Sequence, residues 1–163
     1  MTYYRHADAA DRVRSAITAA ETIVSLDLYP AHKRELLSVC IWKITEAAPV
    51  SKYQTRFRSR ASLSAPESEL AHDHVNQRKS LIDEMIAHPE EVGRILQTAV
   101  ACVATRSEHE RLTGVSRENP DLDGWERYKK AGIDVVDLEA LQAEPPNLTL
   151  NPGASPAPLS LVR

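Results

Sequence analysis

Cysteine is scarce in this 163-residue chain, and so are long apolar runs. The two cysteines, Cys40 and Cys102, lie far apart and form no CxxC pair, which argues against a paired zinc knuckle. No stretch approaches the ~20 apolar residues of a membrane span, and the first residues, MTYYRHADAADR, lack the apolar run of a secretory signal. We therefore expect a cytoplasmic protein with reduced thiols and no membrane partner.

Excess positive charge is also missing, since the formal net charge is −3. This excludes capture of nucleic acid by the surface as a whole. The apolar fraction of 42% and the length suffice for one domain with a real core. We expect residues 1–140 to form that domain. Residues 141–163 read as a Pro-rich disordered tail, because five of the ten prolines lie between Pro145 and Pro158.

Apolar residues that recur every three or four positions predict an N-terminal helical hairpin. Its first helix follows Asp8 and runs to about residue 28, and Pro30 begins the second, which ends near residue 48. Two further helices are expected, one capped by Asn76 and one beginning at Pro89. The chain therefore reads as an α+β protein that is mostly helical.

Two short apolar runs, Leu70–Val75 and residues 100–105 (VACVAT), predict strands. The second run leads directly into a capping box, Thr105-Arg106-Ser107-Glu108, which marks the start of a helix. His109 then lies in the first turn of that helix, and Gly114 suits its end. Residues 50–66 read as a loop, and a last strand is expected at residues 133–136.

The residues Asp73-His74-Val75, Ala101-Cys102-Val103 and His109 together resemble the HNH family of nucleases. The similarity covers about residues 68–112. It implies a ββα-metal core, a two-stranded hairpin followed by one helix. The match is to a degenerate member, because the family's asparagine ahead of the second strand has no clear counterpart. Short phrases such as WKITEA and GWERYKKAGI also resemble small bacterial and phage proteins of unassigned role.

This resemblance implies a divalent-metal-dependent endonuclease that hydrolyses phosphodiester bonds in DNA or RNA. Asp73 and His109 would hold the metal (Mg²⁺, Mn²⁺ or Zn²⁺), and His74 would be the general base. The chemistry needs such groups, since a histidine near neutral pKa can take a proton from water and a divalent ion can neutralise charge at phosphorus. Ideal strand alternation, however, sends neighbouring side chains to opposite faces, so Asp73 and His74 face one metal only if the strand ends irregularly.

A basic stretch, KYQTRFRSR, precedes the first of these strands. In an extended chain its alternating arginines would lie on one side and form a rail for phosphates. Its aromatic residues could stack on the bases of a single strand. The predicted nucleic-acid contacts are Lys52, Tyr53, Arg56, Arg58 and Arg60.

Other functions stay open at this point. The same scaffold without a working metal site would be a non-catalytic module that binds nucleic acid or another protein, with the Pro-rich tail as a docking segment. A structural zinc site is a further alternative, with His72, His74, Cys102 and His109 as its four ligands. Basic loops and single histidines are also commonly surface or packing residues.

Overall fold

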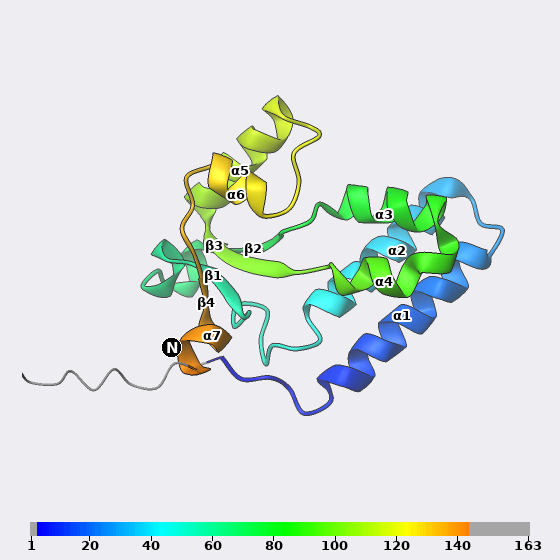
Figure 1. Ribbon diagram of the computed structural model, residues 1–163, viewed down its shortest axis with the longest axis horizontal. Coiled ribbons are helices and arrows are strands. Elements are labelled where there is room, and N and C mark those ends of the chain that lie inside the picture. Colours follow the sequence, from blue (N-terminus) through cyan, green and yellow to red (C-terminus); the bar gives the residue numbers. More distant parts are fainter. Residues whose placement is uncertain (1–2, 144–163) are drawn as a thin grey trace, which may run out of the picture.

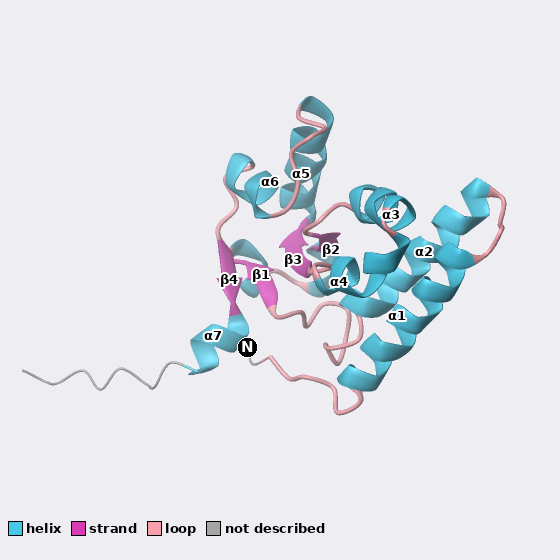
Figure 2. Cartoon of the chain, turned by 45° about the vertical axis from the view of Figure 1, so that its right-hand side comes forward, coloured by secondary structure: helices cyan, strands magenta, loops and turns pink. Residues whose placement is uncertain are grey.

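The computed structural model describes residues 3–143, which form an α+β fold of seven α-helices and a four-stranded mixed sheet (Figures 1 and 2). The α-helices are α1 (Ala9–Ser25), α2 (Pro30–Thr45), α3 (Arg78–Ala87), α4 (Val92–Gln97), α5 (Arg106–Glu118), α6 (Trp125–Lys130) and α7 (Leu138–Ala143). The strands are β1 (Phe57–Ser59), β2 (Leu70–His74), β3 (Ala101–Thr105) and β4 (Val135–Asp137). The prediction of a mostly helical α+β protein is confirmed.

The predicted helical hairpin is formed by α1 and α2, and α3 and α4 pack against it (Figure 1). Their apolar faces meet in one cluster, in which Leu37, Ile41, Met85, Ile95 and Leu96 are fully buried. Asp8 precedes α1 as predicted, but its side chain makes no capping hydrogen bond. Among the described residues, no helix is both long and apolar enough to cross a bilayer.

The strand order in the sheet is β2-β3-β1-β4. β2 and β3 pair antiparallel, with Asp73 opposite Cys102 and His74 opposite Ala101. β3 then passes directly into α5, so the predicted order of strand, strand and helix is present. β2 is an edge strand, and Asp73 and His74 at its end line a cleft.

The capping box at the start of α5 forms as predicted. The Thr105 hydroxyl accepts from the Glu108 amide at 3.3 Å, and the Glu108 carboxylate accepts from the Thr105 amide at 2.8 Å. The predicted end at Gly114 is wrong, because α5 continues to Glu118. A Cβ at Gly114 would meet no atom within 4 Å, so a glycine there neither relieves a clash nor stops the helix. The cap expected at Asn76 is also shifted, since Gln77 precedes α3.

Two short strands differ from what the sequence patterns predict. β1 lies inside the segment expected to be a loop and pairs parallel with β3 and antiparallel with β4. β4 begins at Val135, two residues later than the start of the strand predicted at 133–136. α7 extends to Ala143, past the expected domain boundary at residue 140. The rest of the predicted tail lies outside the described residues.

Candidate functional site

The end of β2 and the first turn of α5 bring Asp73 and His109 together, as the sequence predicts. The Asp73 Oδ1 and His109 Nε2 atoms are 3.5 Å apart. Asp73 is buried, whereas 42% of the His109 side chain is exposed. The pair therefore combines a carboxylate inside the protein with an imidazole that solvent can reach.

Two residues of α6 hold the Asp73 carboxylate in place. The Tyr128 hydroxyl donates to Oδ2 at 2.7 Å, and the buried Arg127 guanidinium lies 3.5 Å from both carboxylate oxygens. Burial, together with the nearby Cys102 and Asp73, raises the pKa of Tyr128 strongly, so its hydroxyl keeps the proton that it donates. Arg127 also donates to the His74 and Val75 carbonyls, which ties α6 to the end of β2.

His74 leaves β2 on the opposite face, as strand alternation predicts. Its ring packs edge-on against Trp42 of α2, with centroids 4.4 Å apart, and its Nε2 lies 3.4 Å from the Thr45 hydroxyl. Burial, and then the neighbouring His72 and Arg78, lower the pKa of His74 to about 3. The ring is therefore neutral at neutral pH and retains one nitrogen lone pair.

His72 lies on the same face as His74, with ring centroids 5.3 Å apart. Its Nδ1 is 3.0 Å from the Lys52 carbonyl, which can only accept, so Nδ1 carries the proton in this hydrogen bond. Nε2 is then the acceptor, and it is buried without a hydrogen-bond partner. Burial also lowers the pKa of His72. The neutral imidazoles of His72 and His74 thus lie next to each other, and both pack against the Trp42 ring.

Both faces of the end of β2 open into one cleft of about 510 Å³. The cleft has room for one small ligand. The side chains that line it come from α2, β2, α3, α5 and α6, and include Trp42, His72, Asp73, His74, Gln77, Arg78, Lys79, His109 and Arg127. Three of these are formally cationic and one is a carboxylate, so the cleft favours an anion.

The Asp73–His109 pair fits a divalent cation with few protein ligands. Two metal–ligand bonds of about 2.1 Å can span a 3.5 Å separation. Mg²⁺ commonly uses one or two protein carboxylates and fills its other positions with water and substrate oxygens. The part of the chain that the structure describes contains no group of three or more metal-ligating side chains. The four-ligand zinc alternative is therefore wrong, and Cys102 is completely buried.

The predicted arginine rail requires a correction. Arg56 forms hydrogen bonds of 2.9 and 2.6 Å with Asp137, and Arg60 donates to Asp134 at 2.6 Å. These carboxylates lie on or just before β4, whose pairing with β1 was not predicted. Because they neutralise the two guanidiniums, the row is not an unopposed positive surface.

The other three residues predicted to bind nucleic acid have different surroundings. Arg58 is 1% exposed and donates to the Ser62 carbonyl at 2.7 Å, so it does not face solvent. The Lys52 ammonium lies 4.7 Å from the centre of the Tyr53 ring. The Lys52 carbonyl contacts His72, which brings this loop beside the cleft. Nucleic-acid binding by Lys52 and Tyr53 stays a prediction.

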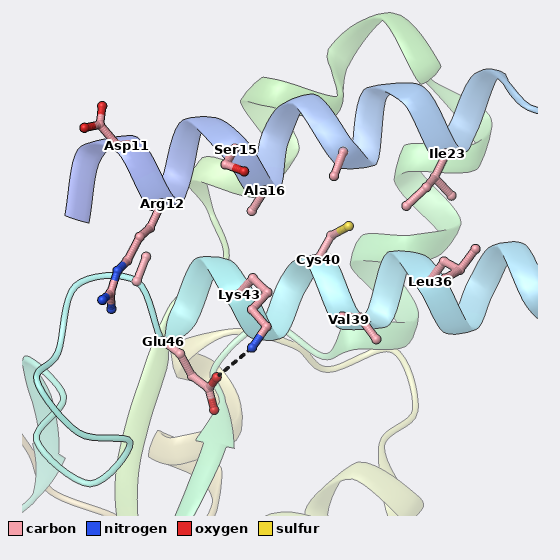
Figure 3. A pocket seen from close by; sticks show the side chains of 12 residues that line it. Asp11, Arg12, Ser15, Ala16, Ile23, Leu36, Val39, Cys40, Lys43 and Glu46 are labelled. Atoms are coloured by element: carbon pink, nitrogen blue, oxygen red, sulfur yellow. Dashed lines mark ion pairs between the residues drawn. The ribbon is translucent and has the colours of Figure 1, made fainter. Parts of the chain in front are cut away.

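A larger hollow, of about 760 Å³, lies between α1 and α2 (Figure 3). Figure 3 shows apolar side chains such as Ile23 and Leu36 along it and the Lys43–Glu46 ion pair toward one end. It holds no histidine and no residue singled out above as a metal ligand or base. The smaller cleft at β2 is therefore the better candidate for chemistry, despite its size.

Sequence reasoning missed the cations of the cleft and the residues that hold Asp73. Arg78 and Lys79 follow the Asp-His-Val motif within five residues, and this short spacing was the available signal. Tyr128 is buried, and its hydrogen bond joins it to Asp73, 55 positions away in the chain, a contact that no sequence pattern indicates. Arg127 gave no signal, because a lone arginine on a short helix is most often a surface residue.

The fold and the cleft together define a small α+β protein in which an antiparallel strand pair and the following helix present a carboxylate and an imidazole to a basic cleft. Comparison of the chain with protein-family models, with curated proteins and with solved structures found no match. Any functional proposal therefore depends on the chemistry of the cleft.

Proposed function

We propose that this protein is an HNH-like, divalent-metal-dependent endonuclease that hydrolyses phosphodiester bonds in DNA or RNA. The observation that carries the proposal is the 3.5 Å approach of His109 Nε2 to Asp73 Oδ1 at the end of an antiparallel strand pair. The reaction would take place in the cytoplasm, where the free thiols Cys40 and Cys102 stay reduced.

Asp73 and His109 would hold the metal, which supplies charge neutralisation at the phosphate and at the leaving oxygen. Tyr128 and Arg127 orient the Asp73 carboxylate through contacts that do not involve the metal. Arg78 and Lys79, on the same cleft, would bind the non-bridging phosphate oxygens. Asp73 and His109 would thus bind the metal, whereas Arg78 and Lys79 would bind the phosphate.

His74 would act as the general base. Its neutral ring can accept a proton, but a group with a pKa of about 3 is a weak base. A phosphate bound beside it stabilises the imidazolium form and so raises that pKa toward the useful range. Substrate binding would therefore activate the base, and the free protein would hold it in an inactive state.

A cleavage assay tests the proposal directly. Plasmid DNA and short DNA and RNA oligonucleotides are incubated with the protein and Mg²⁺, Mn²⁺ or Ni²⁺, with chelator as the reference. We expect cleavage that chelator abolishes, that His74→Ala and His109→Ala both lose, and that the exposed-histidine control His88→Ala keeps. Full cleavage by His74→Ala would remove the general-base assignment, and no cleavage by the natural protein with any of the metals would overturn the proposal.

One observation favours a second candidate, a non-catalytic module that binds nucleic acid or a protein. The Asp73 carboxylate already accepts from Tyr128 and lies beside the Arg127 guanidinium, so it has favourable partners without a metal. Under this alternative the same oligonucleotides bind, metal does not change their affinity, and they stay intact.

A further inference from the structure

We infer that the cleft at β2 takes single-stranded nucleic acid, with an unpaired base stacked on Trp42 and the adjoining phosphate held by Arg78 and Lys79. The hydrolysis of that strand rests on the proposed function, but its binding does not. The inference names the form of the substrate, which the Asp73–His109 pair alone leaves open.

The size of the cleft is the first argument. Its volume of about 510 Å³ is that of a small-ligand pocket. Bases in a duplex are stacked inside the helix and offer only their edges in the grooves. A ring at the wall of such a cleft can therefore stack on a base only if that base is unpaired or flipped out of the duplex.

Trp42 supplies the aromatic surface. It is half-buried on α2, and it lines the cleft together with the two histidines of β2. The Arg78 guanidinium lies 5.4 Å from the centre of the Trp42 ring. Aromatic rings and guanidinium groups are the groups on which unpaired bases stack, largely without regard to sequence.

The charge next to Trp42 matches a phosphate. Arg78 donates to the Ser38 hydroxyl at 2.8 Å, and neither Arg78 nor Lys79 forms an ion pair with a described acidic residue. By contrast, Arg34 on the adjacent α2 is paired with Asp83.

Binding is measured in chelator, so that no strand is cleaved. The probes are a fluorescein-labelled single-stranded DNA, an RNA of the same sequence, and the corresponding DNA duplex, followed by anisotropy. We expect both single strands to bind at least about tenfold more tightly than the duplex, since stacking contributes only where bases are free. Equal or tighter binding of the duplex would overturn the inference.

Variants locate the binding site. Trp42→Leu should weaken single-strand binding about tenfold while Trp42→Phe, which keeps an aromatic ring, should weaken it less. Arg78→Gln changes an exposed side chain, so a folding defect is not expected, and it should weaken binding and flatten its salt dependence. Trp125→Phe is the matched control, because Trp125 lines a separate hollow with Phe57.

Trp125→Phe also leaves Trp42 as the sole tryptophan of the chain. Its fluorescence should then be quenched by a single strand and unaffected by the duplex. Unchanged affinity in both Trp42→Leu and Arg78→Gln would overturn the inference, even if cleavage is observed. Tight single-strand binding that depends on Trp42, with no cleavage in any metal, would instead support the inference and overturn the proposed nuclease.

Discussion

On one face of β2, the Asp73 carboxylate is surrounded by hydrogen-bond donors, whereas on the other face His74 lies against Trp42 with one weak polar contact. The two residues are neighbours in sequence and open into the same cleft. On one face, hydrogen-bond donors thus surround a carboxylate. On the other face, the imidazole rings are neutral and shielded from solvent. This difference separates a position suited to a cation from a position suited to a proton acceptor.

The largest expected effect comes from breaking the charged face. Asp73→Ala leaves the Arg127 guanidinium buried without its carboxylate, and loss of one partner of a buried ion pair typically costs about 3–5 kcal/mol. Urea unfolding measures this loss. The exposed Asp27→Ala is the control and should change stability little. A loss below about 1 kcal/mol in Asp73→Ala would show that the Asp73–Arg127 pair stabilises the fold no more than an exposed ion pair does.

The neutral face predicts a smaller, pH-dependent effect. The folded-state pKa of His74, about 3, lies below its ordinary value of 6.5, so the unfolded chain binds more protons between these values. Stability is therefore lost as pH falls from about 6.5 toward 3, by roughly 2–3 kcal/mol between pH 7 and pH 4.5.

Thermal or urea unfolding from pH 7 to pH 4.5 checks the sign and size of this effect. His74→Gln, which cannot titrate, should flatten the profile. The same substitution at the exposed His88 should leave the profile as it is. If stability rises on acidification, or if His74→Gln keeps the full slope, His74 is not buried as a neutral ring.

The smallest expected effect lies outside the cleft, at the corrected arginine row. The Arg60–Asp134 pair is mostly exposed, so Arg60→Ala should cost less than about 1 kcal/mol. Because Asp134 already neutralises Arg60, the substitution should barely change the salt dependence of oligonucleotide binding. Lys79→Ala should lower that salt dependence by about one counterion. If Arg60→Ala changed the salt dependence of binding more than Lys79→Ala, the result would support the predicted arginine rail.

Local signals account for the part of the fold that was predicted. The capping box at Thr105 and Glu108 depends on side chains three residues apart, and it formed as expected. Pro30 marked the start of α2 in the same way. β2 and β3 were each predicted from an apolar run, whereas their antiparallel pairing was implied only by the resemblance to a ββα core.

The remaining part depends on pairings between distant residues. β1 and β4 have three residues each, and the charged residues around β1 interrupt the apolar pattern from which a strand is predicted. The acidic partners of Arg56 and Arg60 lie more than 70 residues away in the chain, and no periodicity reports such a contact. The candidate site divides similarly. The resemblance to the ββα core implied that Asp73 and His109 lie close together, but nothing in the sequence indicated that Tyr128 reaches Asp73 from α6.

Binding of Mn²⁺ to the protein, followed by electron paramagnetic resonance, tests the central claim most directly, because the signal of free Mn²⁺ falls when the ion is bound. The claim is that Asp73 and His109 form one divalent-metal site, with His74 outside it. We expect one bound Mn²⁺ per chain, lost in Asp73→Asn and His109→Ala and kept in His74→Ala. No binding by the natural protein, or binding that both Asp73→Asn and His109→Ala retain, would contradict the claim.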